Sequence, residues 1–371
     1  MASREKVVVA MSGGVDSSVA AGLLHEQGYD VVGLFMRSGV EMPAPADGAL
    51  RDATVRPHQG CCSAADAADA RFVAGMLGIP FYALNFREEF DAIIDYFAAE
   101  YAAGRTPNPC IVCNSRLKFG KLLEYADAVG ARSVATGHYA RIGTRGGRPV
   151  LCRARDAAKD QSYALFGLNR SDLGRVRFPV GELTKPQVRA EAQRLGLPVS
   201  DKPDSVEICF VPDDDYARLV RQRHPEAFVP GNVVDAEGRV LGRHEGVPNF
   251  TIGQRRGLGI AAGKPIYVTR VDVNTHEVTV GDADRLLSRT LVADRVNTLA
   301  DVPDSFRADV KIRYLHTATP ATVERLVDGA VRVTFDEPQR AVTPGQAVVF
   351  YDADVVLGGG WITRAGDSPD D

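Results

Sequence analysis

The segment Ser12–Ser18 has the residue types and spacing of a phosphate-binding loop. It lies between an apolar run that predicts a strand and a pattern that predicts a helix, where backbone N–H groups and the positive helix end can hold an anion. Gly13 and Gly14 let the backbone approach a phosphate closely. The alternative is a small-residue turn that only begins a helix. A Gly-x-x-x-x-Gly-Lys-Ser/Thr motif occurs nowhere in the chain, which argues against a P-loop kinase or GTPase.

Two of the six cysteines, Cys110 and Cys113, form a Cys-x-x-Cys pair. We predict a helix that starts near Asn114, and the helix N-terminus together with Arg116 would favour the thiolate of Cys113. Cys209 lies in an apolar, strand-like run, where a cysteine is either reactive or a small buried hydrophobic residue. No second pair stands at ligand spacing, which argues against a zinc site. We expect the remaining cysteines to be structural, namely Cys61, Cys62 and Cys152.

The ordered motifs of the chain resemble those of the tRNA-specific 2-thiouridylases, a family of the N-type ATP pyrophosphatase superfamily. The Ser-Gly-Gly-x-Asp-Ser loop is shared across that superfamily, so it indicates adenylation by ATP but no particular substrate. The motifs that select the family are Cys61-Cys62-Ser63, Gly104–Pro109, Cys113-Asn114, Lys118-Phe119, Ala135–Ala140, Lys159–Tyr163, Ser205–Phe210 and Gly253–Gly257. The resemblance covers nearly the whole chain.

The resemblance implies ATP-dependent 2-thiolation of the wobble uridine of tRNA. The C2 oxygen is a poor leaving group, so it would first be adenylated by ATP with Mg²⁺, and pyrophosphate would leave into the loop. By the same resemblance, Cys209 carries sulfur as a persulfide and Cys113 is the catalytic nucleophile, and the two end as a disulfide. The implied ATP-binding residues are Ala10, Met11, Ser12, Gly13, Gly14, Val15, Asp16, Ser17, Met36 and Gly137.

Cys110 and Asp16 are each open to alternative roles. Cys110 stands where many family members have Asp, and a thiol cannot polarise the target base as a carboxylate would. Cys110, Cys113 and Cys209 could instead hold three corners of an iron–sulfur cluster that binds sulfide, although we prefer the persulfide route. The Asp16 carboxylate could orient Mg²⁺ or pyrophosphate, or it could cap the following helix.

The formal net charge is -4, so any RNA-binding surface must be local. Arg105–Lys121 and Thr251–Arg270 contain cations and no acid, which makes them candidates for phosphate contacts, although such a run is more often a solvated face. The target base must flip out of the anticodon loop. The predicted tRNA contacts, most of them implied by the resemblance, are Asn108, Pro109, Cys110, His138, Lys159, Asp160, Gln161, Arg255, Arg256, Arg313, Tyr314 and Gln346. His138 could otherwise be a core histidine.

The elements that must position these residues follow from hydrophobic periodicity. Strands are predicted over Lys6–Met11, Asp30–Phe35, Phe81–Leu84 and Ser133–Thr136, alternating with helical patterns, which indicates βαβ units and a mostly parallel sheet. After about Pro212, hairpins and then alternating strands predict an antiparallel barrel. The fold class is therefore α/β: a Rossmann-like N-terminal domain, a small central α+β domain and a C-terminal β-barrel.

We predict three domains: residues 1–212 for ATP pyrophosphatase chemistry, 213–283 for a small tRNA-binding domain, and 284–371 for a tRNA-binding barrel with a disordered tail. The stretch Gly39–Gly60 predicts a long surface loop. No apolar run is long enough for a membrane helix or a signal-peptide core, so we expect a cytoplasmic protein without a membrane partner. The expected partners are tRNA and a persulfide donor, either a cysteine desulfurase or a sulfur-relay protein, and we expect a monomer.

Two rival functions stay open at this level. An adenylating ligase or amidotransferase that uses ammonia would need neither Cys113 nor Cys209. A catalytically silent RNA-binding protein would need no intact phosphate loop.

Overall fold

The computed structural model describes residues 4–39, 64–204, 208–211, 215–260 and 263–366. The chain forms two compact units: Met1–Ile93 with Cys110–Asp214, and Ile94–Pro109 with Asp215–Asp371. Within the described ranges, no helix is long and apolar enough to cross a membrane. The motif Cys61-Cys62-Ser63, Ser205 and nearly all of the predicted loop over Gly39–Gly60 lie outside the described residues.

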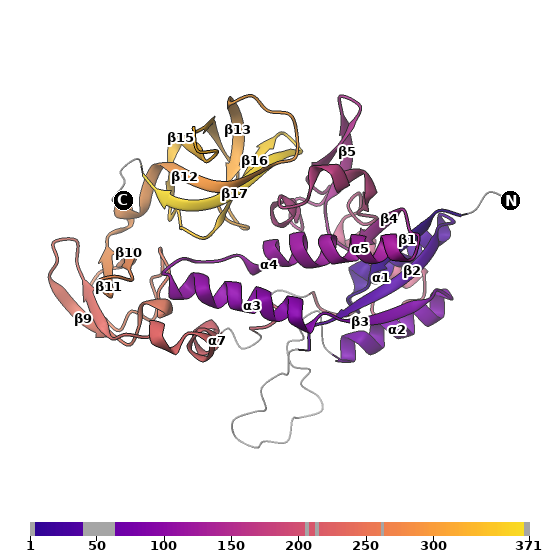
Figure 1. Ribbon diagram of the computed structural model, residues 1–371, viewed down its shortest axis with the longest axis horizontal. Helices are drawn as coiled ribbons and strands as arrows, with labels where there is room; N and C mark the ends of the chain where they lie inside the picture. Colours follow the sequence, from indigo (N-terminus) through magenta and orange to yellow (C-terminus); the bar gives the residue numbers. More distant parts are fainter. Residues whose placement is uncertain (1–3, 40–63, 205–207, 212–214, 261–262, 367–371) are drawn as a thin grey trace, which may run out of the picture. The chain divides into compact units, whose positions relative to one another are not determined.

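The first unit is built on a parallel sheet of five strands in the order β3-β2-β1-β4-β7 (Figure 1). The strands are β1 (Lys6–Ala10), β2 (Asp30–Arg37), β3 (Phe81–Asn85), β4 (Ser133–Thr136) and β7 (Val176–Arg177). Val7, Val8 and Val9 of β1 are fully buried, as expected of a central parallel strand that is covered on both faces. The predicted parallel sheet is therefore confirmed.

The strand order reverses beside β1, and this fixes where a ligand can bind. The chain runs from β1 to β2 on one side, whereas β4 pairs with the other side of β1, with Val7 opposite both Val31 and Ser133. In open α/β sheets, ligands bind beyond the carboxyl ends of the strands at such a reversal. Ser12–Ser18 follows β1 and Gly137 follows β4, so both lie at this position.

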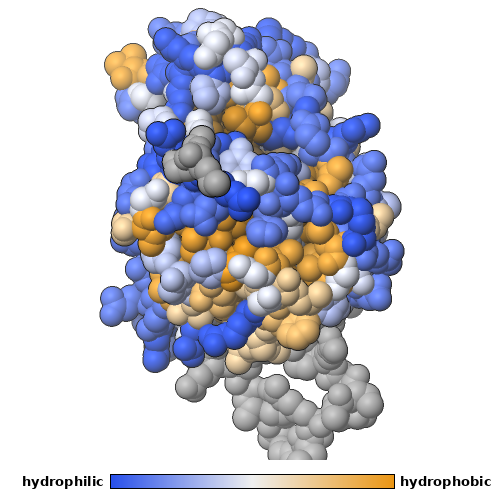
Figure 2. Space-filling view, turned by 90° about the vertical axis from the view of Figure 1, so that its right-hand side faces the viewer, coloured by the Kyte–Doolittle hydropathy of each residue, from blue (hydrophilic) through white to orange (hydrophobic). Residues whose placement is uncertain are grey.

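Helices α1 (Val15–Glu26), α2 (Ala64–Leu77) and α5 (Leu122–Ala128) pack against the sheet, and α6 (Lys185–Arg194) packs on α1. Gly22 permits this last contact, since a Cβ there would lie 2.7 Å from Leu195. The unit also contains the hairpin of β5 (Arg141–Arg145) and β6 (Arg148–Cys152), and the 3₁₀-helices η2 (Ser162–Leu165) and η3 (Arg170–Arg175). Large apolar side chains of this unit that remain exposed are Phe72, Met76 and Tyr82, and Figure 2 shows apolar residues among hydrophilic ones on one side of the molecule.

The helix that carries the catalytic cysteine candidate begins earlier than predicted. It consists of α4 (Pro109–Val112), the π-helix η1 (Cys113–Lys121) and α5. The expected start near Asn114 is wrong because Pro109, whose fixed φ suits the first helical position, begins the helix. Cys113 therefore lies one turn inside, at the junction of α4 and η1. π-helical segments occur frequently at functional sites.

The prediction of a strand-like conformation around Cys209 is also wrong. Ile208–Val211 form a turn in which the Val211 N–H donates to the Ile208 carbonyl at 2.9 Å. The segment is apolar because the turn is partly buried, with Phe210 and Val211 both largely shielded from solvent. Apolar content alone does not distinguish the two conformations.

The later part of the second unit starts with α7 (Tyr216–Arg223) and the short η4 (Pro225–Ala227). A four-stranded sheet follows in the order β10-β11-β8-β9. Its elements are β8 (Gly231–Val234), β9 (Val240–His244), η5 (Val247–Asn249), β10 (Tyr267–Asp272), β11 (Glu277–Gly281) and η6 (Ala283–Leu286). The hairpins predicted after about Pro212 are confirmed as β8–β9, which turns at Glu237-Gly238, and β10–β11, which turns at Asn274-Thr275.

Six antiparallel strands then form the C-terminal barrel in the order β12-β15-β14-β13-β16-β17, and pairing of β12 with β17 closes it. They are β12 (Leu287–Thr298), β13 (Ser305–Lys311), β14 (Thr319–Arg325), β15 (Val331–Arg340), β16 (Ala347–Asp352) and β17 (Val355–Ala365). Alternate residues such as Val331, Val333 and Phe335 fill the interior. The barrel prediction is confirmed.

The segment Ile94–Pro109 belongs to this second unit although it comes from the N-terminal part of the chain. It contains the latter part of α3 (Arg87–Ala102). The ring of Tyr101 stacks on Tyr216 with centroids 4.4 Å apart, and the Thr106 N–H donates to the Pro344 carbonyl at 2.9 Å.

Candidate functional site

The loop Ser12–Ser18 is held in a tight conformation by its own side chains. The Ser17 hydroxyl accepts from the Ser12 N–H at 3.1 Å and donates to the Gly14 carbonyl at 3.2 Å, and the Ser18 hydroxyl donates to the same carbonyl at 2.8 Å. Gly13 has φ +76, and a Cβ there would lie 2.2 Å from the Asp66 carbonyl oxygen. Only glycine fits this position.

Gly137 brings the end of β4 against the start of α1. A Cβ at Gly137 would lie 2.5 Å from the Ser17 nitrogen, so the two backbones touch with no room for a side chain. Of the other predicted ATP-binding residues, Met11 is fully buried in the core and Met36 is half-buried at the end of β2. The loop and Gly137 thus form one continuous backbone surface beyond the strand ends.

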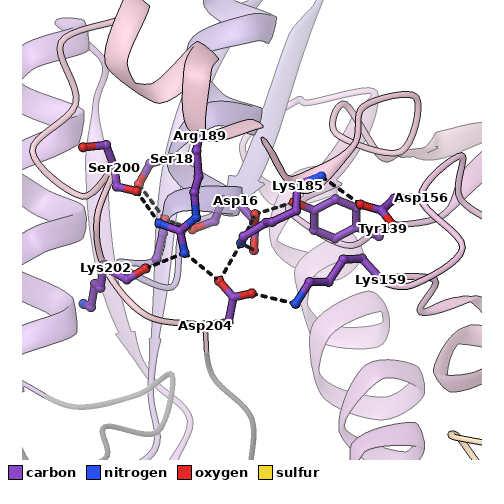
Figure 3. Close-up of polar contacts among 12 residues, drawn as sticks. Asp16, Ser18, Tyr139, Asp156, Lys159, Lys185, Arg189, Ser200, Lys202 and Asp204 are labelled. Carbon is purple, nitrogen blue, oxygen red and sulfur yellow. Dashed lines mark hydrogen bonds and ion pairs between the residues drawn. The ribbon is translucent and has the colours of Figure 1, made fainter. Parts of the chain in front are cut away.

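Asp16 accepts hydrogen bonds from two side chains to which the sequence analysis assigns no role (Figure 3). The Tyr139 hydroxyl donates to Oδ1 at 2.8 Å, and Lys185 Nζ donates to Oδ1 at 2.8 Å and to Oδ2 at 2.9 Å. Burial and the nearby Asp16 carboxylate raise the pKa of Tyr139 well above its ordinary value, so this hydroxyl stays a donor. Gly14 is the N-cap of α1 without a side-chain hydrogen bond, so the alternative of Asp16 as a helix cap is wrong.

The Asp204 carboxylate forms ion pairs with three cations, one of which is Lys185 (Figure 3). Lys185 Nζ lies 2.7 Å from Oδ1, Lys159 Nζ 2.8 Å from Oδ2, and an Arg189 guanidinium nitrogen 3.3 Å from Oδ1. Burial alone would raise the pKa of Asp204, but the hydrogen bonds from Lys159 and Lys185 outweigh it and hold the pKa below its ordinary value. Asp204 is therefore an ionised bridge between α6 and the segment around Lys159.

Lys202 fixes the phosphate loop to α2. Its ammonium donates to the Gly13 carbonyl at 3.0 Å, to Asp66 at 2.6 Å and to Asp69 at 2.7 Å. Burial alone would lower the pKa of Lys202, but the two carboxylates outweigh it and raise the pKa. All three donors of the ammonium are thus used, and Asp66 is a buried partner of Lys202.

The three candidate cysteines differ in exposure. Cys110 is exposed in the first turn of α4, whereas Cys113 and Cys209 are half-buried. Cys113 and Cys209, both described residues, are not joined by a disulfide in this structure. Cys152, predicted to be structural, is buried in β6.

The described residues do not fit an iron–sulfur cluster. Within the described ranges, no three His, Cys, Asp or Glu side chains gather as metal ligands, and this includes Cys110, Cys113 and Cys209. Three thiolates would have to converge to hold three irons of a cluster. For Mg²⁺, Asp16 supplies a carboxylate of the preferred donor type beside the phosphate loop, and both of its oxygens accept hydrogen bonds from Lys185 or Tyr139 in this structure.

The predicted tRNA contacts Lys159, Asp160 and Gln161 lie together at one turn, which hydrogen bonds join to Tyr139, the residue after His138. Asp160 is buried and accepts from the Ala154 N–H at 3.0 Å and from the Ser162 hydroxyl at 2.9 Å, so it shapes the turn. Gln161 exchanges two hydrogen bonds with the backbone of Tyr139. His138 is half-buried, and its Nδ1 lies 2.8 Å from the Thr136 hydroxyl.

The predicted contacts of the second unit lie in three places. Gln346 donates to the carbonyls of Thr106 and Pro107 at 2.9 and 3.2 Å, which fixes the chain just before Asn108. Arg313 and Tyr314 are exposed after β13. Arg255 and Arg256 are exposed in the central region, where Arg255 and Lys264 line a hollow of about 670 Å³.

Comparison with known proteins gives matches along the whole chain. Three family models match in succession: the tRNA methyl transferase HUP domain over residues 5–213, the tRNA methyl transferase PRC-barrel domain over 218–282, and the Aminomethyltransferase beta-barrel domain over 288–362. The tRNA-specific 2-thiouridylase MnmA of Carboxydothermus hydrogenoformans is 50% identical over 366 residues, which cover 97% of this chain and 98% of that protein. The protein of the same name from Geobacter metallireducens is 50% identical over 369 residues, covering 98% of each.

Solved structures resemble the chain more distantly. A 4-thiouridine synthetase–RNA complex with bound ATP has a TM-score of 0.36 and 17% identity, covering 60% of this chain and 53% of that one. NMN synthetase from Francisella tularensis has a TM-score of 0.34 and 18% identity, covering 60% and 77%. These likenesses are too distant to bear on the site.

Proposed function

Because this chain belongs to the tRNA-specific 2-thiouridylase family, and so uses ATP to place sulfur at C2 of the wobble uridine of tRNA, we propose roles for its individual residues in that reaction. The observation that carries the proposal is the backbone surface formed by Ser12–Ser18 and Gly137 at the strand-order reversal. This is where an α/β sheet binds a nucleotide.

The first step is adenylation of the target base. The uridine C2 oxygen attacks the α-phosphorus of ATP, the bond from the α-phosphorus to the bridging oxygen breaks, and pyrophosphate leaves. Mg²⁺ bound with the triphosphate would compensate the charge of the leaving group. The residues proposed to bind ATP are Ala10–Ser17, Met36 and Gly137, and Asp16 would orient the magnesium that accompanies the triphosphate. Met11 would act through its backbone, since its side chain lies in the core.

The second step delivers sulfur from Cys209. A persulfide on Cys209, received from a cysteine desulfurase or a sulfur-relay protein, holds the terminal sulfur. The Cys113 thiolate attacks the inner sulfur, a Cys113–Cys209 disulfide forms, and the released sulfur attacks C2 as AMP leaves. Two electrons from a thiol reductant then restore both thiols. We propose a cytoplasmic setting for this cycle, because a reducing compartment keeps such thiols available.

The remaining chain would hold tRNA. We propose that residues 1–212 perform the chemistry and that 213–283 and 284–371 bind tRNA as part of a monomer. Asn108, Pro109 and Cys110 would meet the flipped base. The other proposed contacts are His138, Lys159, Asp160, Gln161, Arg255, Arg256, Arg313, Tyr314 and Gln346. The exposure of Arg255, Arg256, Arg313 and Tyr314 supports this assignment, since RNA binding needs accessible cations and aromatic faces.

Substitution of the two cysteines tests the sulfur route. Cys113→Ser and Cys209→Ser should each abolish 2-thiouridine formation, measured by mass spectrometry of tRNA incubated with ATP, a persulfide source and reductant. Both variants should bind tRNA like the native protein, because neither change removes a cation. Cys152→Ser, which alters a buried cysteine of β6, is the matched control and should remain active. Full activity of either Cys113→Ser or Cys209→Ser would refute the proposed roles.

A further inference from the structure

Two separate chains of hydrogen bonds join the Lys159–Gln161 turn to Asp16 of the phosphate loop. We propose that these chains couple the binding of tRNA to the binding of ATP, so that each substrate increases the affinity of the other. This inference rests on the proposed function, in which Lys159–Gln161 contacts tRNA and Ser12–Ser18 holds the triphosphate.

The first chain alternates in charge. It runs from Lys159 to Asp204 at 2.8 Å, from Asp204 to Lys185 at 2.7 Å, and from Lys185 to both oxygens of Asp16 at 2.8 and 2.9 Å (Figure 3). Lys185 is only 9% exposed, so its ammonium has little water to replace a lost carboxylate. A change at one end of the chain therefore alters the bonds at the other end.

The second chain passes through Tyr139. Gln161 and Tyr139 exchange two bonds: the Tyr139 N–H donates to the Gln161 side chain at 2.9 Å, and the Gln161 N–H donates to the Tyr139 carbonyl at 2.8 Å. The Tyr139 hydroxyl donates to Asp16 at 2.8 Å. Tyr139 is buried, so a displacement of the turn moves this ring against Asp16. Both chains end on one carboxylate.

The charges determine the sign of the coupling. A tRNA phosphate that draws Lys159 away from Asp204 leaves Asp204 with less positive charge around it. Asp204 then attracts the Lys185 ammonium more strongly, and the hydrogen bonds from Lys185 to Asp16 weaken. The Asp16 carboxylate becomes more available to the magnesium that accompanies ATP. By thermodynamic linkage, bound MgATP must favour tRNA binding by the same factor.

The test measures the dissociation constant of an ATP analogue with a methylene group between the α- and β-phosphorus atoms, which cannot release pyrophosphate. With Mg²⁺ and the native chain, unmodified tRNA should lower this constant about fivefold or more, a typical allosteric coupling. Tyr139→Phe, which removes only the hydroxyl, should reduce the ratio, and the double variant Tyr139→Phe/Asp204→Asn should bring it close to one. Asp127→Asn is the matched control, because Asp127 pairs with Arg175 elsewhere in the same unit.

Two results would overturn the inference: a ratio near one for the native chain, or a ratio that neither Tyr139→Phe nor the double variant changes. The reciprocal tRNA measurement must give the same ratio by linkage, so it checks the titrations themselves. Failure of the proposed function has separate signs, since 2-thiouridine would not form at all, or Lys159→Met would leave tRNA affinity unchanged. Thermal unfolding verifies that each variant is folded. If the double variant does not fold, Tyr139→Phe alone decides, and an unchanged ratio there refutes the tyrosine route and with it the coupling as proposed.

Discussion

At the scale of single residues, the site combines side chains whose type reveals their role with others whose type does not. Glycines before a helix and paired cysteines can be recognised from the sequence, and Gly13 and Gly137 do lie where backbones meet. Lys185, Lys202 and Tyr139 were missed because their types are common on any surface. One signal was available: Lys185 is the first residue of α6, where a cation opposes the helix dipole. Such a local conflict often marks a functional residue.

Gly13 has a natural control in Gly147. The two have nearly equal φ, +76 and +75, but a Cβ at Gly147 would meet nothing within 4 Å, whereas at Gly13 it would collide with the Asp66 carbonyl. Gly147→Ala should cost about 1–2 kcal/mol from backbone strain and leave ATP binding intact. Gly13→Ala should in addition displace the loop and weaken ATP binding at least about tenfold, which equals about 1.4 kcal/mol. Calorimetric titration with ATP measures both, and equal ATP affinity of the two variants would contradict the steric argument.

At the scale of elements, periodicity predicted β1–β4 well because buried parallel strands are continuous apolar runs, but it missed the hairpin β5–β6 and the short β7. It failed at the helix start, where Pro109 could equally belong to a turn or to a first helical position, and at Cys209, where an apolar run forms a turn. These ambiguities are resolved by tertiary packing. The same packing joins the phosphate loop to α2 through Lys202, a link between residues 189 positions apart.

Lys202 should contribute much more to stability than an exposed lysine in an ion pair. Its partner Asp66 is buried, so Lys202→Met would leave a carboxylate without its cation and should cost about 3–5 kcal/mol. Lys121→Met, which removes an exposed pair with Glu124, should change stability little. Urea unfolding of the two variants gives the comparison. Similar midpoints would mean that Lys202 does not anchor the loop.

At the scale of the whole molecule, acid should weaken the second unit. Burial, together with the charges of Arg313 and Lys311, lowers the pKa of His316, and burial also lowers the pKa of His244 despite its bond to the His276 carbonyl. His244 Nδ1 accepts from the Gly246 N–H at 3.0 Å, which requires the neutral ring. The unfolded state therefore binds more protons, and stability is lost as pH falls below about 6.5, the ordinary histidine pKa.

Trp361 provides the measurement, since it is the single tryptophan of the chain and lies in β17. The urea midpoint reported by its fluorescence should be lower at pH 5.5 than at pH 7.5. His244→Phe should flatten this dependence, whereas His224→Gln, at a half-buried histidine beside Glu226, should not flatten it. Coincident midpoints at the two pH values would contradict the prediction.

Binding of tRNA should depend steeply on salt despite the net charge of -4. Arg255→Ala with Arg256→Ala should weaken binding and reduce the slope of log K against log[salt] by about 1.4, at about 0.7 per phosphate contact on a single strand. Arg307→Ala is the control, because Asp336 already neutralises Arg307 at 2.6 Å. Filter binding over a salt series measures both. An unchanged slope would remove Arg255 and Arg256 from the interface.

Because Ile94–Pro109 belongs to the second unit, its partners are synthesised much later than the segment itself. The Gln346 amide that holds the Thr106 carbonyl is made 240 residues later, roughly 10–50 s at ordinary elongation rates. Tyr101 emerges before Tyr216, the residue of α7 that stacks on it, and Thr106 emerges before Pro344 and Gln346, which bind it. The end of this segment, just before the helix that carries Cys113, therefore stays without these partners until β16 is being made, and the second unit can be completed only after that point.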